Sequence, residues 1–282
     1  MKYTIDNIYN NELKSDCKNC FGLCCTALFF SVCDGFPQNK DAGKPCINLK
    51  NDFTCSIHNN LRKKGLKGCT SYECFGAGQK TSQITCNGVS WRDNSQSASD
   101  IFDSFLIIRQ LHEIMWYLTQ AYSLQHDYDI KTQIGNLIDH TIDLTLLNMD
   151  RLLKLDIESH RDKVNLYLKN TSEYIRKKSQ EYNLKSSSNV KKKIKGKVFL
   201  GKNLTNYNLC GADLRGALLI AANLSNTDLN GADFIGADLR DTDLSGADLS
   251  KSIFLSQAQI NSAKGNEKTK LPPMITRPDH WK

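Results

Sequence analysis

Residues 202–256 read "KNLTN YNLCG ADLRG ALLIA ANLSN TDLNG ADFIG ADLRD TDLSG ADLSK SIFLS", and the pattern repeats every five residues. A large apolar residue stands third in every pentad, and a small residue opens most of them. The large apolar positions are Leu204, Leu209, Leu214, Leu219, Leu224, Leu229, Phe234, Leu239, Leu244, Leu249 and Phe254. A period of five fits neither the 3.6-residue repeat of a helix nor the alternation of an ordinary strand.

The pentads instead predict a solenoid in which five residues form one side of a roughly square coil. The large and the small residue both point inward, and equivalent positions stack between coils at the strand spacing of about 4.8 Å. Asp or Asn usually stands between them and suits a tight corner, since its side chain bonds to nearby backbone. We expect nearly three coils from these pentads, with a structural role for the apolar column.

The segment 199–258 resembles the pentapeptide-repeat family, which implies a right-handed quadrilateral β-helix. Members of that family that act on DNA gyrase are long acidic rods that imitate duplex DNA. Residues 199–263 of this chain carry seven Asp against four basic residues, so the segment is only mildly acidic. Electrostatic imitation needs a dense and extended field. A gyrase- or topoisomerase-binding resistance protein is therefore an alternative and not the main hypothesis.

Apolar residues recur near a period of 3.6 between residues 96 and 184, which indicates helices. We expect three of them, at about 97–124, 129–149 and 157–182, packed as a small antiparallel bundle. His112, His140 and His160 lie on separate predicted helices. A three-histidine metal site is conceivable, but we interpret each histidine as a partly buried surface residue.

The excess of positive charge, +7 overall, lies mainly in residues 185–198, which carry six lysines and no acidic residue. This composition predicts a flexible, solvated linker. Aromatic residues that could stack on bases are not interleaved with the lysines, so nucleic acid is not expected as a partner. Beyond the repeat, residues 259–282 are predicted to form a cap, in which Trp281 packs over the end of the solenoid.

Residues 16–25 read "DCKNCFGLCC" and open a cysteine-rich segment that we assign to residues 1–95. Pairs spaced by two or three residues let one loop present two thiolates to one ion. The candidate ligands are Cys17, Cys20, Cys24, Cys25, Cys46, Cys55, His58, Cys69 and Cys74. Cys33, Cys86 and Cys210 lie outside this spacing pattern, and we interpret them as structural.

Ten of the eleven cysteines precede residue 87, and the N-terminus lacks the apolar stretch of a signal peptide. No apolar run is long enough to span a membrane. We therefore expect a cytoplasmic protein with reduced thiols, in which metal binding is favoured over disulfides or a catalytic nucleophile. Eight cysteines and one histidine would suit two zinc sites, or one iron–sulfur cluster with spare thiols.

The text "CKNCFGLCC…KPCINLKNDFTCSIHNNLRKKGLKGC" resembles the CxxCxxxCC zinc- or iron-chelating domain family over residues 14–78. Cys46, Cys55 and Cys69 fill the family's later cysteine positions in order, and His58 replaces the commoner tyrosine. The resemblance implies metal chelation, and the family includes a flagellin lysine methylase thought to carry an iron–sulfur cluster. The order of cysteine cluster, helices, repeat and "RPDHW" end also resembles a group of bacterial pentapeptide-repeat proteins.

These features predict an α+β multidomain protein with a cysteine-rich metal-binding module, a helical bundle and a short right-handed quadrilateral β-helix. The main hypothesis is a protein that binds zinc or an iron–sulfur cluster and acts without catalysis, as an interaction scaffold for a protein partner. No Ser-His-Asp order, paired carboxylates or phosphate loop supports catalysis. A cluster-dependent, methyltransferase-like modifying enzyme is the alternative that family resemblance suggests.

Overall fold

The computed structural model describes residues 3–186 and 192–281 of the 282-residue chain. The chain forms two compact units, 1–168 and 169–282, which we call unit 1 and unit 2. Their boundary falls inside the long helix α8 (Ile157–Ser186). The cysteine-rich segment and the first helices of the predicted bundle therefore share one unit. The basic segment predicted as a linker lies partly outside the described residues.

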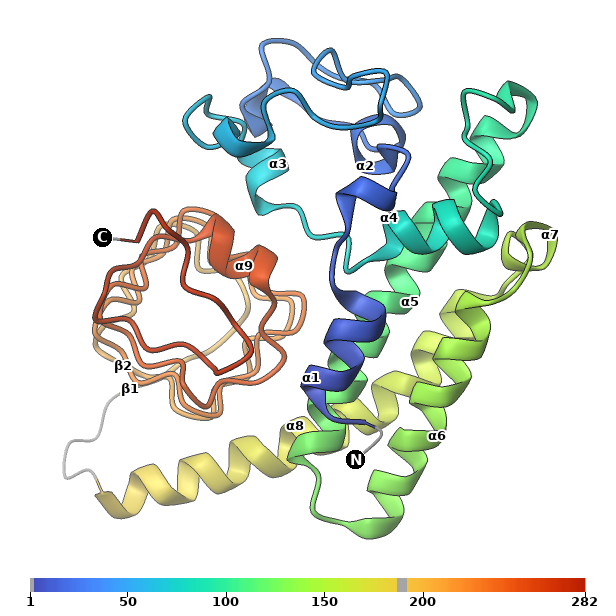
Figure 1. Ribbon diagram of the computed structural model, residues 1–282. Coiled ribbons are helices and arrows are strands. Elements are labelled where there is room, and N and C mark those ends of the chain that lie inside the picture. Colours follow the sequence, from blue (N-terminus) through green and yellow to red (C-terminus); the bar gives the residue numbers. More distant parts are fainter. Residues whose placement is uncertain (1–2, 187–191, 282) are drawn as a thin grey trace. The chain divides into compact units, whose positions relative to one another are not determined.

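Unit 1 is built on α5 (Ala98–Leu124) and α6 (Tyr128–Thr145), which pack side by side (Figure 1). Asp127 begins α6, because its Oδ1 accepts a hydrogen bond of 3.0 Å from the backbone N–H of Ile130. The predicted second helix ends earlier than expected. A new N-cap at Asn148 starts the separate turn α7 (Met149–Leu152).

The cysteine-rich part of unit 1 contains only short helical turns. The α-helical turns are α1 (Ile5–Ile8), α2 (Leu23–Ala27), α3 (Lys67–Ser71) and α4 (Ala77–Lys80). The 3₁₀ and π turns are η1 (Tyr9–Leu13), η2 (Cys17–Asn19), η3 (Val32–Asp34), η4 (His58–Asn60), η5 (Thr81–Thr85) and η6 (Ser95–Ser97). Helices α2 and α4 both pack on α5, so the irregular segment rests on a regular support.

The main core of unit 1 lies where α2 and α4 meet α5. Leu23, Ala77, Phe105, Ile108 and Leu111 are all buried there with no exposed surface. Burial of this kind stabilises by roughly 25 cal/mol per Å² of apolar surface removed from water. The position of α2, which carries two of the candidate cysteines, is therefore fixed by the core.

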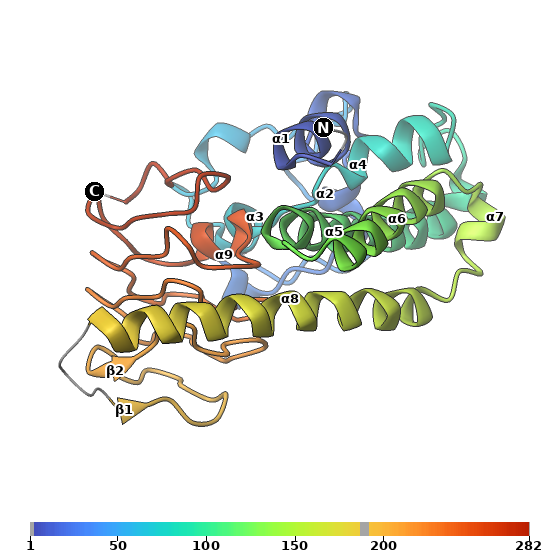
Figure 2. The same cartoon turned by 90° about the horizontal axis from the view of Figure 1, so that it is seen from below.

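In unit 2 the pentads form stacked coils with a period of twenty residues, which is four pentads. Parallel bridges join Asp213 to Asp233, Leu218 to Asp238 and Asp233 to Ile253. Figure 1 shows the coils end on as four-sided rings, and Figure 2 shows them stacked. Among the described residues the only regular sheet is the parallel pair β1 (Lys192–Lys193) and β2 (Tyr207–Asn208). All eleven large apolar side chains of the pentads are buried, with exposed fractions of 2% or less.

The corners of the coils need a residue in the left-handed backbone region. Gly216 and Gly236 occupy such corners with φ of 61° and 66°, and Ala221 takes the same conformation with φ of 56°. The Asp or Asn of a pentad accepts a hydrogen bond from the backbone N–H two residues later. Examples are Asp213 with Arg215 at 3.2 Å and Asp228 with Asn230 at 2.9 Å. These side chains therefore serve the corners of the coil.

The C-terminal residues continue the stack beyond the last pentad, because Lys264 bridges Asp243 and Lys270 bridges Asp248. Helix α9 (Gln257–Ser262) starts with a capping box between Ser256 and Gln259. Trp281 is buried, packs against Gly265, and donates from Nε1 to the carbonyl oxygen of Ala263 at 3.2 Å. The tryptophan is thus a packing residue, as the sequence predicts.

The second half of α8 lies along one side of the coils within unit 2 (Figure 2). Ser172 Oγ donates to Asp233 Oδ2 at 2.5 Å, and Asp233 is fully buried. Arg176 Nε and Gln180 Nε2 donate to the carbonyl oxygen of Gly211 at 3.2 and 2.8 Å. This part of α8 belongs to the repeat unit, because its polar side chains complete hydrogen bonds of the coils.

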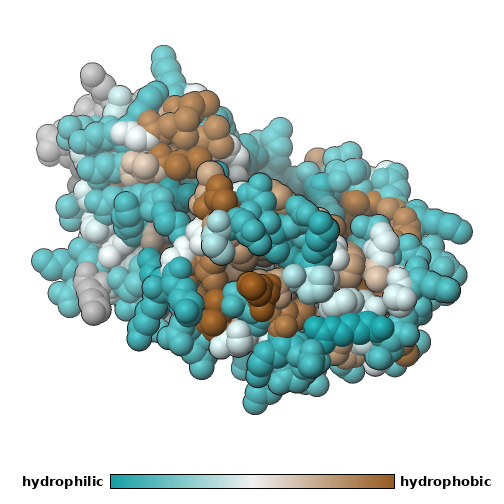
Figure 3. Space-filling model, turned by 90° about the horizontal axis from the view of Figure 1, so that it is seen from above, coloured by the Kyte–Doolittle hydropathy of each residue, from teal (hydrophilic) through white to brown (hydrophobic). Residues whose placement is uncertain are grey.

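Polar side chains cover much of the face drawn in Figure 3, and apolar side chains gather in separate patches. On unit 2, the exposed apolar residues include Val198, Leu200 and Leu218. A parallel bridge joins Val198 to Leu218, so these side chains lie on neighbouring coils. Among the helices of the described residues, none is long and apolar enough to cross a lipid bilayer.

Candidate metal centre

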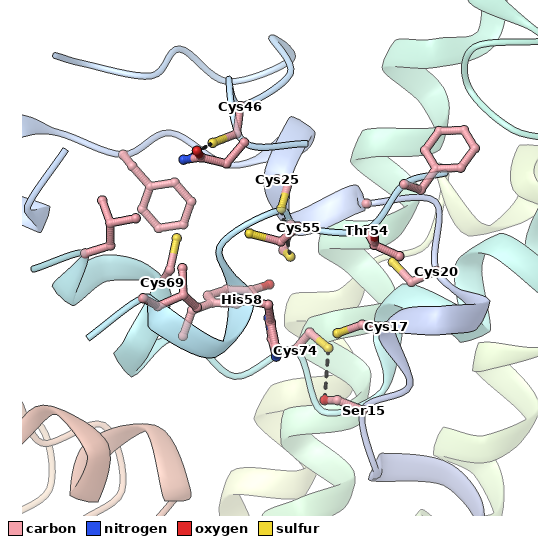
Figure 4. A pocket seen from close by; sticks show the side chains of 18 of the residues that line it. Ser15, Cys17, Cys20, Cys25, Cys46, Thr54, Cys55, His58, Cys69 and Cys74 are labelled. Carbon is pink, nitrogen blue, oxygen red and sulfur yellow. Dashed lines mark hydrogen bonds between the residues drawn. The ribbon is translucent and has the colours of Figure 1, made fainter. Parts of the chain in front are cut away.

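One cavity of about 600 Å³ in unit 1 is lined by every ligand that the sequence predicts. Its walls include Cys17, Cys20, Cys24, Cys25, Cys46, Cys55, His58, Cys69 and Cys74. Figure 4 shows labelled sulfurs from several segments around this space. Folding therefore brings together candidate ligands that are up to 57 residues apart in the sequence. All eleven cysteines of the chain are free thiols.

Short helical turns carry four of these thiols, with Cys17 in η2, Cys24 and Cys25 in α2, and Cys69 in α3. Gly22 is the N-cap of α2 and has a φ of 63°, a conformation that favours glycine. Cys24 and Cys25 follow it in the first turn of the helix. Asp16 precedes η2, and its Oδ1 accepts a 3.0 Å hydrogen bond from the backbone N–H of Lys18. An antiparallel bridge between Leu49 and Cys55 closes the turn that separates Cys46 from Cys55. Local structure thus positions the segments that carry these thiols.

Burial raises the pKa of most of these thiols, so they ionise less readily than a solvated cysteine. It raises the pKa of Cys20 to about 12 and that of Cys69 to about 12. A hydrogen bond with Cys25 and burial together raise the pKa of Cys24, whereas the same hydrogen bond lowers the pKa of Cys25. The Sγ atoms of this pair lie 4.0 Å apart. A cation in the cavity would supply the positive charge that the buried thiolates need.

Lys40 is a neighbour of the thiols that sequence reasoning missed. Its side chain is buried, and Nζ donates to the carbonyl oxygens of Thr26, at 2.6 Å, and Leu28. Burial lowers the pKa of Lys40, and the thiols of Cys46 and Cys25 act in the opposite direction. The sequence contains no signal for this contact, because only the bridge between Phe30 and Lys40 brings the lysine back toward α2.

Ser15 is a second contact that the spacing of cysteines does not reveal. Its Oγ lies 3.1 Å from Cys74 Sγ and also donates to Glu73 Oε1 at 2.9 Å. The hydroxyl joins the segment before Cys17 to the segment of Cys74, although 59 residues separate the two. It therefore helps to hold two parts of the cavity wall together.

The three cysteines interpreted as structural do not line the cavity. Cys33 is exposed in η3, Cys86 is buried in the main core of unit 1, and Cys210 is buried in unit 2. Cys210 Sγ donates to the carbonyl oxygen of Ser179 at 3.4 Å. These residues provide matched controls, because each offers the same chemistry outside the cavity.

The histidines of the helices do not join the cavity either. His112 and His160 are buried, with exposed fractions of 0% and 5%, so the interpretation as a partly buried surface residue is wrong for both. The Nδ1 atom of His112 lies 2.6 Å from the carbonyl oxygen of Phe75, which the helix packing brings next to α5. His140 and His160 lie with ring centroids 5.3 Å apart, and Thr141 Oγ1 lies 3.0 Å from His160 Nε2. Fold contacts therefore account for these side chains.

The donor set of the cavity fits a thiophilic metal. Thiolate sulfur selects zinc and iron–sulfur clusters, and eight such donors line one space. Within residues 3–186 and 192–281, no three histidine, cysteine, aspartate or glutamate side chains lie close enough to bind one ion as they are placed. The thiols thus surround the space without meeting at one point. The segments that carry the thiols would have to move for them to bind one ion together.

Comparison with known proteins supports the interpretation of the pentads as a repeat. The model of the family described as "Pentapeptide repeats" matches residues 203–236 and 217–254, with eight copies. The chain is therefore a pentapeptide-repeat protein over this segment. It is also 49% identical over 277 residues to the uncharacterized protein YybG of Bacillus subtilis (strain 168). That match covers 98% of this chain and 97% of YybG, and the chain belongs to the same family.

Proposed function

We propose that unit 1 binds a thiolate-ligated metal, as zinc or an iron–sulfur cluster, and that the protein acts as a non-enzymatic interaction scaffold. The observation that carries this proposal is that eight cysteines and His58 line one cavity. A bound metal would join segments that are otherwise connected mainly by short turns. Structural zinc in small domains contributes apparent binding free energies of about 10 kcal/mol or more.

The residues of this chain would hold the metal and restrict its chemistry. Cysteine thiolates provide the first contacts, and the buried Lys40 offsets part of their negative charge. Phe30, Phe36 and Leu66 form an apolar wall on one side, which limits access of water. Such a shell is typical of a protected metal site, because apolar surroundings control solvent access.

The experiment is anaerobic purification of the full chain under reducing conditions, followed by metal and sulfide analysis and an absorption spectrum. A brown protein with iron and sulfide indicates a cluster, and a colourless protein with stoichiometric zinc indicates zinc. The Cys20→Ser variant should contain less metal than the wild type, whereas the matched control Cys33→Ser should retain the full amount. A metal-free wild type that keeps its helical circular dichroism would disprove metal binding.

For unit 2 we propose that the stacked coils are the right-handed quadrilateral β-helix typical of pentapeptide repeats and that they present a protein-binding surface. The support is the exposed apolar group Val198, Leu200 and Leu218. Leu218 occupies a position that carries Asp in most other pentads. An outward apolar side chain at such a position adds nothing to the buried column, and contiguous exposed apolar surface often marks an interaction site.

The Leu218→Asp variant tests this second part, since Asp is the ordinary residue of the repeat and should leave the coils folded. Proteins captured from extracts by wild type and variant would be compared by quantitative mass spectrometry. Loss of a specific protein with Leu218→Asp, but not with the control Arg240→Ala, is the expected result. Identical captured proteins from both would contradict the proposed surface.

A further inference from the structure

The eight cysteines of the cavity divide into two groups, by the core against which five of them pack and by the contacts of the segments that carry the other three. Group 1 comprises Cys17, Cys20, Cys24 and Cys74. Group 2 comprises Cys25, Cys46, Cys55 and Cys69. Cys20, Cys24 and Cys74 pack against the main core of unit 1. Cys46 and Cys69 pack against a different, small core of Phe30, Phe36 and Leu66.

Contacts of the intervening segments hold group 1 together. Ser15 Oγ lies 3.1 Å from Cys74 Sγ, which places the start of the chain beside the segment after α3. The backbone N–H of Asp16 donates to Gln79 Oε1 at 3.1 Å, and Gln79 Nε2 donates to the carbonyl oxygen of Lys14 at 2.7 Å. These hydrogen bonds hold the segment just before Cys17 against α4.

Cys20 completes this side of the cavity through close packing on α4. A Cβ atom added to Gly78 would lie only 2.6 Å from Cys20 Sγ, so the sulfur sits directly on the helix backbone. Cys20 therefore lies on the α4 side of the cavity.

Group 2 has its own set of backbone contacts. The backbone N–H of Cys46 donates to the carbonyl oxygen of Cys25 at 2.9 Å. Cys55 is bridged to Leu49, and Ser56 N–H donates to the carbonyl oxygen of Asn48 at 2.9 Å. Three segments that carry Cys25, Cys46 and Cys55 are therefore connected directly.

Cys69 joins this group from α3. Its side chain packs against the same small core as that of Cys46. Figure 4 shows Cys25, Cys46, Cys55 and Cys69 toward one end of the cavity and Cys17, Cys20 and Cys74 toward the other. Packing and backbone contacts agree on the same division.

The adjacent pair Cys24 and Cys25 lies at the border between the groups. Consecutive residues of α2 point in different directions, about 100° apart around the helix. Cys24 packs on the main core, whereas Cys25 is the residue whose carbonyl holds Cys46. Each member of the pair therefore belongs to a different group, although their sulfurs are only 4.0 Å apart.

We propose that unit 1 holds two separate metal centres, one ligated by the four thiolates of group 1 and the other by the four thiolates of group 2. This inference rests on the proposed metal-binding function. Four thiolates are the complete ligand set both of a structural zinc ion and of an iron–sulfur cluster. His58 lines the cavity but is not required by either centre. The Cys24–Cys25 sequence then has a specific role, which is to supply one ligand to each of two neighbouring centres.

The first test uses the wild-type chain purified anaerobically with its metal. Metal is removed in steps with a chelator, and thiols exposed at each step are alkylated and identified by peptide mass spectrometry. The thiols should become reactive in two sets of four that match group 1 and group 2. After the first step, the peptide that contains Cys24 and Cys25 should carry one alkyl group. Simultaneous release of all eight thiols would overturn the division.

The second test uses two pairs of substitutions in the full chain. Cys17→Ser with Cys20→Ser removes ligands of group 1, and Cys46→Ser with Cys69→Ser removes ligands of group 2. Each double variant should retain about half of the wild-type metal per chain. The control Cys33→Ser should retain all of it, and His58→Ala should also keep the full amount.

The outcomes of the second test separate this inference from the proposed function. If both double variants lose all metal while keeping wild-type helical circular dichroism, one shared centre is present and the inference is wrong. If one double variant loses everything and the other nothing, only one group binds metal, and the inference is again wrong. A wild type without metal would instead refute the proposed function itself. Because the alkylation experiment needs no substitution, misfolding of a variant leaves the first test decisive.

Discussion

Acidification should destabilise unit 1 through His112. Its imidazole is fully buried in α5 and has one ring nitrogen, Nδ1, 2.6 Å from the carbonyl oxygen of Phe75. Nε2 is buried and has no hydrogen-bond partner among the residues that the structure describes. Burial lowers the pKa of His112 to about 4, against about 6.5 for a solvated histidine. The folded protein therefore keeps the neutral ring under conditions in which the unfolded chain binds a proton.

The sign and size of the effect follow from these two pKa values. Between about pH 6.5 and pH 4 the unfolded chain binds more protons, so the free energy of unfolding falls as the pH falls. From pH 7.5 to pH 5 the loss from this one group is about 2 kcal/mol, and it approaches about 3 kcal/mol below pH 4. A loss of that size is a large fraction of the total stability of an ordinary domain.

Urea unfolding followed by circular dichroism at 222 nm, at pH 7.5 and pH 5, measures the effect. His112→Asn is the matched variant, because the amide nitrogen can still donate to Phe75 but does not titrate. His160, whose pKa burial also lowers to about 4, contributes equally to both proteins. The wild type should lose about 2 kcal/mol more than His112→Asn over this pH range. Equal losses in the two proteins would refute the argument.

Three further predictions concern the repeat and the metal. Leu229→Asp should prevent the coils from folding, because an unpaired charge would replace a fully buried side chain. A soluble variant with wild-type protease resistance would refute this prediction. Ala221→Gly should stabilise unit 2 by up to about 1 kcal/mol in thermal unfolding, because φ is 56° there; a lower melting temperature would count against it. Removal of the metal with a chelator should make residues 14–90 susceptible to limited proteolysis, while the fragment from about residue 199 stays intact. Mass spectrometry of the fragments would show this, and unchanged cleavage would exclude a metal that supports the fold.

The sequence by itself predicts the coils of unit 2 and the positions of the main helices. The pentad pattern is enough because each coil repeats the contacts of the coil before it, so local sequence and packing carry the same period. The buried column from Leu204 to Phe254 and the corner role of Asp and Asn follow directly. The end of α6 at Thr145 is harder to predict from the sequence, because the apolar period continues beyond it, whereas Asn148 starts a new turn in the structure.

The cysteine spacing by itself selects candidate ligands but leaves open whether they serve one centre or two. That distinction depends on contacts between segments up to 59 residues apart, such as Ser15 with Cys74, and on the separate cores against which five of the thiols pack. Likewise, the position of Lys40 depends on its bridge to Phe30, and the burial of His112 depends on the packing around α5. A repeat is encoded by local periodicity, whereas a site built from distant loops is defined only when tertiary packing brings those loops together.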